Sequence, residues 1–190
     1  MKLLVTGSAG YEGSRRLYSD EDDRKKLLER YSESFFDVFE EDVFPDSRQA
    51  FGPLLEEAEA AGLAESGADG GVLAAVWRLL KRNGLGAVFS QRDIPVLQQS
   101  IELAECFDLN PYRMDADSLF VWLAEKEEDI LQSAAAAGIP AAVIGRTTEN
   151  KAILRIDGEK ESFLRRPGPD ASWGTPEDKG RLTSEAWRRT

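Results

Sequence analysis

A succession of strand, helix and strand in the second half of the chain constrains the fold most. Two apolar runs at residues 119–123 and 141–144 flank a helical stretch at residues 125–137, which begins with acidic residues and stops at Gly138 before Pro140. Carboxylates favour the positive end of a helix dipole, and glycine followed by proline ends a helix. A connection of this length with a covering helix joins parallel or neighbouring strands of one sheet by a right-handed crossover. We therefore expect an α/β fold.

Other strand signals extend this unit to a larger sheet. A short strand precedes the glycine-rich stretch near the N-terminus, and residues 86–90 form a further apolar run. Residues 151–156 and 159–164 are joined by Asp157-Gly158, a dipeptide that favours a two-residue hairpin turn. The predicted fold class is α/β (α+β), with a mixed sheet of about four main strands flanked by helices.

Helix signals lie between these strands. One helix is expected after Ser47, ending at Gly62, and the best-marked helix starts at Asp69 and stops at Asn83-Gly84. Pro95 is expected to open another helix as a first-turn proline. The side chains expected to face inward from that helix are those of Leu97, Ile101 and Ala104.

Charge is distributed unevenly along the chain. The 190 residues include 24 Lys and Arg and 35 Asp and Glu, a net charge of 24 − 35 = −11. Residues 20–66 contain fifteen acidic and five basic residues, so nearly the whole excess lies there. Their apolar residues, from Leu27 to Phe39, follow the three- and four-residue steps of amphipathic helices. We interpret the acidic side as a solvated helical face. The acidic balance also argues against nucleic-acid or anionic-membrane partners.

The chemistry available to the chain is narrow. The sequence has no histidine and one cysteine, Cys106, which excludes imidazole bases, histidine-paired nucleophiles and a disulfide framework within one chain. Cys106 lies in an apolar helical stretch and is expected to be a buried, inert thiol. No metal site is predicted. No apolar run approaches the length of a membrane span, and residues 1–7 are too short for a signal peptide, so the expected location is cytoplasmic.

The C-terminal residues differ in composition from the rest. Residues 167–190 contain proline and glycine without an apolar period. We predict one domain at residues 1–166 and a flexible tail at 167–190, for which a docking role is the less favoured alternative.

Two glycine-rich segments are candidates for anion binding. Residues 67–71 precede the best-marked helix, and glycine there allows backbone N–H groups to approach a phosphate. A tight turn that needs glycine for packing is the favoured alternative, because Asp69 would repel an anion. Residues 5–14 follow a strand but match neither a P-loop nor a dinucleotide-binding fingerprint.

An ordered series of motifs resembles a known family. The motifs are Gly10-Tyr11-Glu12-Gly13-Ser14, Asp69-Gly70-Gly71-Val72-Leu73, Asp93-Ile94-Pro95-Val96, Cys106-Phe107-Asp108-Leu109-Asn110-Pro111-Tyr112 and Ala137-Gly138-Ile139-Pro140. Together they resemble the C-terminal domain of the AIR synthase (PurM-like) superfamily, closest to its hydrogenase-maturation-factor (carbamoyl dehydratase) branch. The resemblance spans residues 1–167.

The resemblance implies an ATP-dependent enzyme of which this chain is one half. In the superfamily an N-terminal domain carries the metal-binding aspartates and most of the ATP site, and we expect that domain to be missing. The residues implied in weak phosphate binding are Glu12, Gly13, Ser14, Gly70, Gly71 and Ser118.

Several residues depart from the family pattern. Ser66 and Ala68 stand where an acid and a hydroxyl are usual, and Asp115 and Asp117 replace small residues that tolerate phosphate. The chain also ends in Thr190, where the maturation enzymes carry a cysteine. No catalytic residue is therefore assigned.

Three functional hypotheses follow. The first is a stand-alone C-terminal domain that is non-catalytic alone, needs no cofactor and acts as a binding or assembly module, including by self-association. The second is a subunit of a split ATP-dependent enzyme, which binds ATP and Mg²⁺ only with a separate N-terminal-domain protein. The third is an acidic protein-interaction factor that binds a basic partner through residues 20–66.

Overall fold

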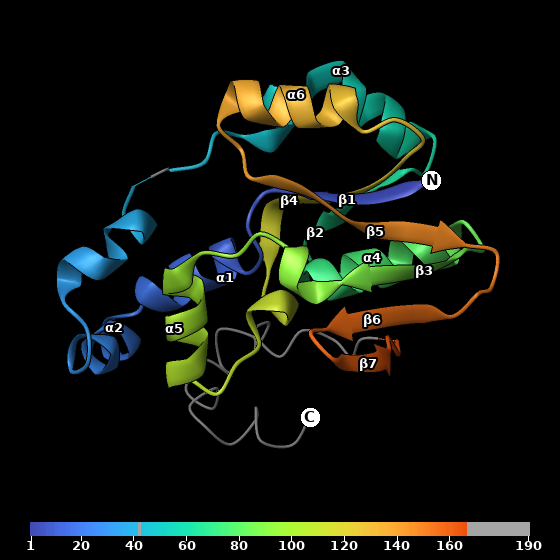
Figure 1. Cartoon of the computed structure of the whole chain (residues 1–190). Coiled ribbons are helices and arrows are strands. Elements are labelled where there is room, and N and C mark those ends of the chain that lie inside the picture. The colour runs from blue at the N-terminus through green and yellow to red at the C-terminus, as the bar shows by residue number, and fades with distance from the viewer. Residues whose placement is uncertain (42, 167–190) are drawn as a thin grey trace.

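Seven strands form one mixed sheet in the computed structural model, which describes residues 1–41 and 43–166 (Figure 1). The strand order across the sheet is β2-β4-β1-β5-β3-β6-β7. The strands are β1 (Lys2–Thr6), β2 (Ala64–Gly67), β3 (Gly86–Ser90), β4 (Ala116–Ala124), β5 (Ala141–Thr148), β6 (Ile153–Asp157) and β7 (Lys160–Phe163). The predicted α/β class is confirmed, and the expected number of about four main strands was too low.

Within residues 1–41 and 43–166, six α-helices and three 3₁₀ turns accompany the sheet. The α-helices are α1 (Tyr11–Tyr18), α2 (Glu21–Leu28), α3 (Ser47–Ala60), α4 (Gly71–Arg82), α5 (Gln98–Cys106) and α6 (Glu128–Ala137). The 3₁₀ turns are Glu33–Phe39, Gln91–Asp93 and Pro111–Arg113. None of the helices in the described ranges is long and apolar enough to cross a membrane.

The strand–helix–strand unit has the predicted geometry with one strand inserted. β4 and β5 are connected through α6, and each pairs antiparallel with β1, which lies between them. The two strands therefore run in the same direction without contacting each other. The hairpin at Asp157-Gly158 is also present, with Asp157 opposite Lys160.

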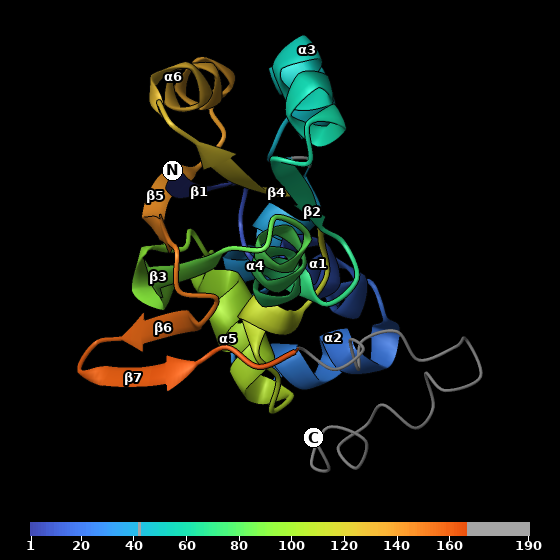
Figure 2. The ribbon, with the colours of Figure 1, turned by 90° about the vertical axis from the view of Figure 1, so that its right-hand side faces the viewer.

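Helices cover both faces of the central strands (Figure 2). α4 packs on one face, in a core that includes Leu3, Val5 and Val76. α3 and α6 pack on the other face, around Leu4 and Trp122. The indole N–H of Trp122 donates a hydrogen bond to the Thr6 hydroxyl at 3.0 Å, which satisfies both buried polar groups.

A third core lies beside the sheet and is rich in aromatic residues. It joins α1, α2, α5 and the 3₁₀ turn Glu33–Phe39. Its buried rings are those of Tyr11, Tyr18, Phe36 and Phe39. Cys106 is only half-buried at the margin of this core, so the expectation of a buried thiol was wrong.

Two helix predictions need correction. The residues from Glu33 to Phe39 form a 3₁₀ turn rather than an α-helix. α5 begins at Gln98, three residues after Pro95, so Leu97 precedes the helix and Ile101 is 38% exposed. The cause is a hydrogen bond from the Ala9 N–H to the Pro95 carbonyl, which holds that carbonyl outside a helix.

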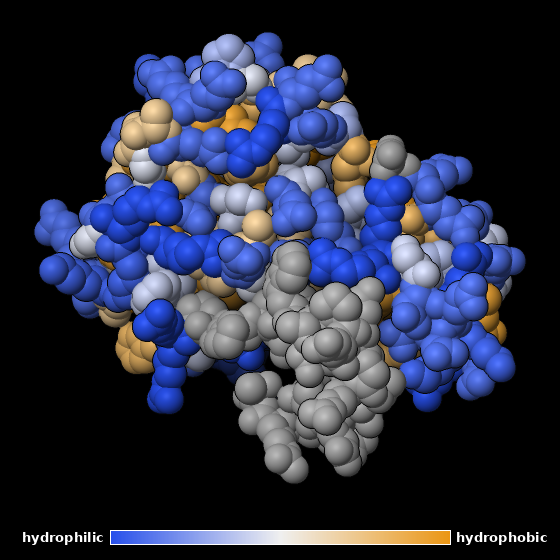
Figure 3. All heavy atoms as spheres, turned by 180° about the vertical axis from the view of Figure 1, so that it is seen from behind, coloured by the Kyte–Doolittle hydropathy of each residue, from blue (hydrophilic) through white to orange (hydrophobic). Residues whose placement is uncertain are grey.

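Surface polarity is consistent with this layering. The face seen from behind in Figure 3 carries mostly hydrophilic side chains, with hydrophobic atoms in small separate areas.

The domain boundary after residue 166 stays a prediction, because the tail at 167–190 falls outside the described residues.

Candidate functional site

Three backbone donors of the N-terminal glycine-rich loop are used within the protein. The N–H groups of Gly7 and Ala9 donate to the carbonyls of Pro140 and Pro95, both at 2.8 Å, and that of Gly13 donates to the Asp115 carbonyl at 3.0 Å. A Cβ on Gly13 would lie 3.0 Å from the Cβ of Met114. Gly13 is therefore a packing residue, and these three donors are unavailable to an external anion.

Glu12 and Ser118, both proposed from the sequence, lie in contact. One carboxylate oxygen of Glu12 accepts a hydrogen bond from the Ser118 N–H at 3.1 Å, and the other oxygen is buried without a hydrogen-bond partner. Burial raises the pKa of Glu12, and the hydrogen bonds from Ser118 oppose that rise. The contact links the start of α1 to the start of β4. Ser14, two residues further along α1, is fully buried, and its hydroxyl has no hydrogen-bond partner among the described residues.

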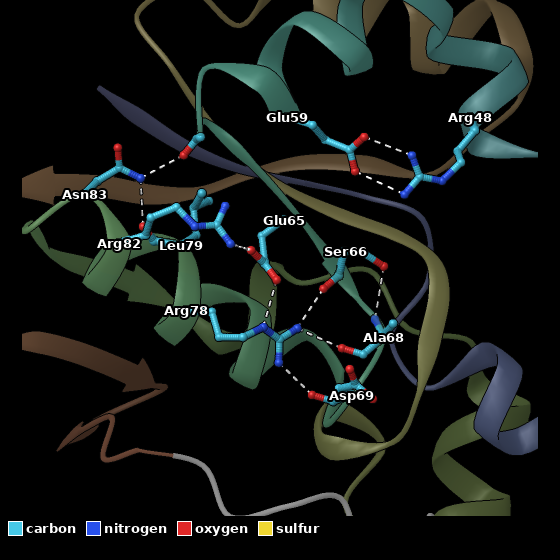
Figure 4. Close-up of polar contacts among 11 residues, drawn as sticks. Arg48, Glu59, Glu65, Ser66, Ala68, Asp69, Arg78, Leu79, Arg82 and Asn83 are labelled. Carbon is cyan, nitrogen blue, oxygen red and sulfur yellow. Dashed lines mark hydrogen bonds and ion pairs between the residues drawn. The ribbon is translucent and has the colours of Figure 1, made fainter.

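The loop before α4 is held by Arg78, as Figure 4 shows. The guanidinium of Arg78 donates to the carbonyl oxygens of Ser66, Ala68 and Asp69 at 2.9, 2.7 and 2.7 Å. It also contacts the Glu65 carboxylate at 2.8 Å. Because three carbonyls face Arg78, the loop keeps one fixed orientation.

The opposite side of that loop is occupied by a carboxylate from the protein itself. Asp115 is fully buried, and its Oδ1 accepts a hydrogen bond from the Asp69 N–H at 3.1 Å. Its Oδ2 contacts Nη2 of Arg16 at 3.1 Å. A backbone N–H before a helix and a guanidinium are the donors that would hold an external phosphate oxygen. Asp115 thus already supplies the negative charge at this position.

Gly71 serves the close approach of two backbone segments, and Gly70 before it has a φ of +95°. Gly71 has a φ of +71°, and a Cβ on it would lie 2.5 Å from the Met114 carbonyl oxygen and 2.8 Å from that of Tyr112. These carbonyls belong to the segment that leads to Asp115. The start of α4 therefore packs against protein backbone.

A further carboxylate adds negative charge nearby. Burial raises the pKa of Asp117, and the neighbouring carboxylate of Asp115 raises it further. A phosphate brought to this region would meet Asp115, Asp117 and Asp69 together. The residues present therefore do not fit a nucleotide phosphate.

A cavity of about 580 Å³ adjoins the Glu12–Ser118 contact. Its lining residues are Tyr11, Glu12, Arg15, Phe44, Pro45, Asp46, Ser47, Arg48, Asp117, Ser118 and Phe120. The other four proposed residues (Gly13, Ser14, Gly70 and Gly71) do not line it. Arg48 makes a two-point ion pair with Glu59 at 2.9 and 3.1 Å (Figure 4), and Asp46 caps α3. Both charges are therefore compensated by protein groups.

Sequence reasoning missed the two arginines that organise this region. Arg16 lies 99 residues from Asp115, and Arg78 reaches back to carbonyls nine to twelve residues earlier. No local spacing signals either contact. Within the described ranges, no group of three or more acidic or cysteine side chains is placed to hold a metal ion.

The comparisons with known proteins agree with this fold. A family model described as AIR synthase related protein, C-terminal domain, matches residues 1–157. The chain belongs to this family. No curated protein matches it.

Solved structures with the same fold include hydrogenase maturation proteins. HypE from E. coli is 21% identical with a TM-score of 0.62, over 87% of this chain and 49% of that one. A chain of a HypE–HypF complex is 16% identical with a TM-score of 0.64, and the match covers 87% of this chain and 52% of that one. AaThiL complexed with AMPPCP and TMP is 16% identical with a TM-score of 0.55, and the match covers 89% of this chain and 50% of that one. The chain thus spans about half the length of these proteins.

Proposed function

We propose that this member of the AIR synthase-related family is non-catalytic alone and acts as a binding or assembly module. The observation that carries the proposal is the buried Asp115 carboxylate, which takes the Asp69 N–H and the Arg16 guanidinium for itself. An added nucleotide phosphate would have to displace a hydrogen-bonded carboxylate and lie among like charges, which is unfavourable. On this proposal the isolated chain needs no cofactor, and it functions in the cytoplasm.

Calorimetric titration of the purified chain with ATP and ADP, each with and without Mg²⁺, tests the proposal. We expect no binding in the micromolar range. A HypE of the kind crystallised with ATP is the positive control. Micromolar binding or nucleotide hydrolysis by the chain alone would contradict the proposal.

A pair of variants tests whether Asp115 is responsible. Asp115→Ser removes the carboxylate that accepts the Asp69 N–H, whereas Asp117→Ser removes a neighbouring carboxylate that is not part of this hydrogen bond. If Asp115 excludes phosphate, pyrophosphate should bind Asp115→Ser detectably and Asp117→Ser no better than the unchanged chain. Equal behaviour of both variants would assign the exclusion to overall charge.

A second candidate is a subunit of a split enzyme. It is favoured by the length comparison, since the chain spans about half of each of the related proteins. On this hypothesis ATP and Mg²⁺ bind only after a separately encoded N-terminal-domain protein completes the site. Co-purification with such a protein, with nucleotide binding by the complex and not by either part, would support it. A stable complex that still ignores ATP would favour the first proposal.

A further inference from the structure

The cavity of about 580 Å³ beside Glu12 has no role in the function proposed so far. Its walls come from the start of α1, the start of β4, and the first residues of α3 with the segment before them. Small-molecule sites are mostly clefts or cavities of about 300–1,000 Å³ with apolar walls and a few polar groups. The size and composition of this cavity therefore suit a small molecule.

Contacts within the protein hold the three walls together. The Ser118 N–H donates to the Glu12 carboxylate at 3.1 Å, and the Ser118 carbonyl accepts a hydrogen bond from the Ser47 hydroxyl at 2.6 Å. The rings of Tyr11 and Phe44 meet edge to face, with their centroids 5.0 Å apart. Because α1, β4 and α3 are joined in this way, the cavity exists before a ligand enters, and binding requires little ordering of the protein.

The apolar part of the lining is aromatic. The guanidinium of Arg48 lies over the ring of Phe120, with 5.1 Å between its Cζ and the ring centroid. The faces of aromatic rings attract cations. The protein thus places one cation of its own against this lining, and Glu59 compensates its charge (Figure 4). Phe44, which is half-buried, offers the ring against which a ligand can pack.

Two carboxylates of the lining lack full compensation. One oxygen of Glu12 is buried without a hydrogen-bond partner among the described residues, and Asp117 is exposed at the start of β4. Burial raises the pKa of both groups, and the charge of Asp117 raises the pKa of Glu12 further. The positive charge of Arg16 lowers the pKa of Asp117 without cancelling the rise. A cation placed beside these carboxylates would stabilise their ionised forms.

The lining disfavours other classes of ligand. An anion would meet the like charges of Glu12 and Asp117. Within residues 1–41 and 43–166, no group of three or more acidic or cysteine side chains is placed to hold a metal ion. Arg15, three residues after Glu12 on α1, also lines the cavity, so a ligand with several positive groups would meet a like charge. The cavity therefore favours one positive group attached to an apolar body.

We propose that the cavity between α1, β4 and α3 binds a small organic cation, whose single ammonium group donates to Glu12 and Asp117 while its apolar part packs against Phe44. This inference gives a ligand class to the binding module proposed above and rests on that proposal. The two can fail separately. A chain that binds neither nucleotide nor amine contradicts this inference alone, whereas a chain that binds nucleotide contradicts the proposed function.

Three small aromatic probes of similar shape test the preference for a cation. Benzylamine carries one ammonium group, benzyl alcohol is its neutral counterpart, and benzoate carries a negative charge. Two-dimensional NMR of the full chain should show a saturable shift of the Ser118 amide resonance with benzylamine, with a dissociation constant in the millimolar range or below. Benzyl alcohol should bind more weakly and benzoate not at all. Equal binding of amine and alcohol, binding of benzoate, or no saturable binding of benzylamine would overturn the proposal.

Variants that keep side-chain size and remove one charge test the two carboxylates. Glu12→Gln should weaken benzylamine binding about tenfold, because it removes a charge-assisted hydrogen bond at a largely buried group. Asp117→Asn should weaken it about threefold, since an exposed ion pair contributes less. Glu21→Gln, at an exposed position on α2 outside the lining, is the matched control and should leave the affinity unchanged.

The exposed position of Asp117 keeps the test decisive even where Glu12→Gln does not fold. Benzylamine affinity that Asp117→Asn leaves unchanged, or that Glu21→Gln lowers by as much, would refute the proposed site.

Discussion

At the scale of single residues, the buried carboxylates determine what the candidate site can bind. Glu12 and Asp115 each accept a backbone N–H, from Ser118 and Asp69, across long stretches of sequence. Buried carboxylates are retained when such donors satisfy them. Both interactions hold in place the start of β4 and the residue directly before it. The carboxylates therefore act as internal anions at positions where the family resemblance implies phosphate.

Glu12 gives a testable dependence of stability on pH. Burial raises its folded-state pKa above the ordinary value of 4.5, so its contribution to stability is complete below pH 4.5 and is lost as pH rises through the higher folded pKa. Glu12→Gln keeps an oxygen for the Ser118 N–H and removes the titration. Urea unfolding at a series of pH values should show the unchanged chain losing stability relative to the variant from pH 4.5 upward.

The matched control for that series is an exposed carboxylate on another element. Glu21 is exposed in the first turn of α2, and Glu21→Gln, which keeps Glu12, should still show the loss of stability from pH 4.5 upward. A Glu12→Gln profile parallel to both would contradict the assigned cause.

The site residues could be predicted only in part, for reasons visible in individual contacts. The sequence singled out Glu12 and Ser118 through the family resemblance, and the structure places them 3.1 Å apart. The sequence indicated Asp115 only as a residue that departs from the family pattern. The pairing of Asp115 with Arg16 joins residues 99 apart, and such a contact depends on the packing of α1 against β4 rather than on local spacing.

At the scale of elements, the start of α4 depends on a glycine that packs against backbone. Gly71→Ala would place a Cβ 2.5 Å from the Met114 carbonyl oxygen in a left-handed conformation. The backbone penalty is about 1–2 kcal/mol and the overpacking adds about 1–3 kcal/mol. We expect urea unfolding to report a loss of about 2–5 kcal/mol.

Gly84 provides the control for backbone conformation alone. It has a φ of +65°, and a Cβ built on it meets nothing within 4 Å. Gly84→Ala should therefore cost only the backbone penalty of about 1–2 kcal/mol. Equal losses for the two variants would mean that the segment before Asp115 moves away without difficulty.

Helices and strands could be predicted from local sequence where no distant contact overrides it. The buried face of α4 and its stop at Gly84 follow from periodicity and a left-handed glycine, and both are present. β2 has the sequence Ala-Glu-Ser-Gly, without alternation, and becomes a strand only because β4 offers it a partner. The predicted start of α5 was wrong because the hydrogen bond from the Ala9 N–H to the Pro95 carbonyl overrides the helix-start signal of Pro95.

At the scale of the whole molecule, topology was the least predictable feature. The strand–helix–strand pattern indicates that β4 and β5 are parallel or neighbouring strands of one sheet, and they are parallel without being neighbours. It does not show that β1, more than 100 residues earlier, is inserted between them. Sheet order is set by which long-range pairings bury the most apolar surface, and one-dimensional patterns contain little information on that choice.

The concentration of negative charge in residues 20–66 predicts how the whole molecule responds to salt. Some carboxylates there are paired, such as Glu33 with Arg24 and Glu59 with Arg48, whereas Glu29, Glu56 and Glu57 are exposed. Like charges that lie close together destabilise the folded state by a few tenths of a kcal/mol per close pair, and salt screens them. We therefore expect unfolding stability to rise with salt concentration. A variant with the three exposed glutamates changed to glutamine should show a smaller rise, because its net charge falls from −11 to −8. An equal salt response in both proteins would mean that these glutamates are solvated well enough to contribute no net repulsion.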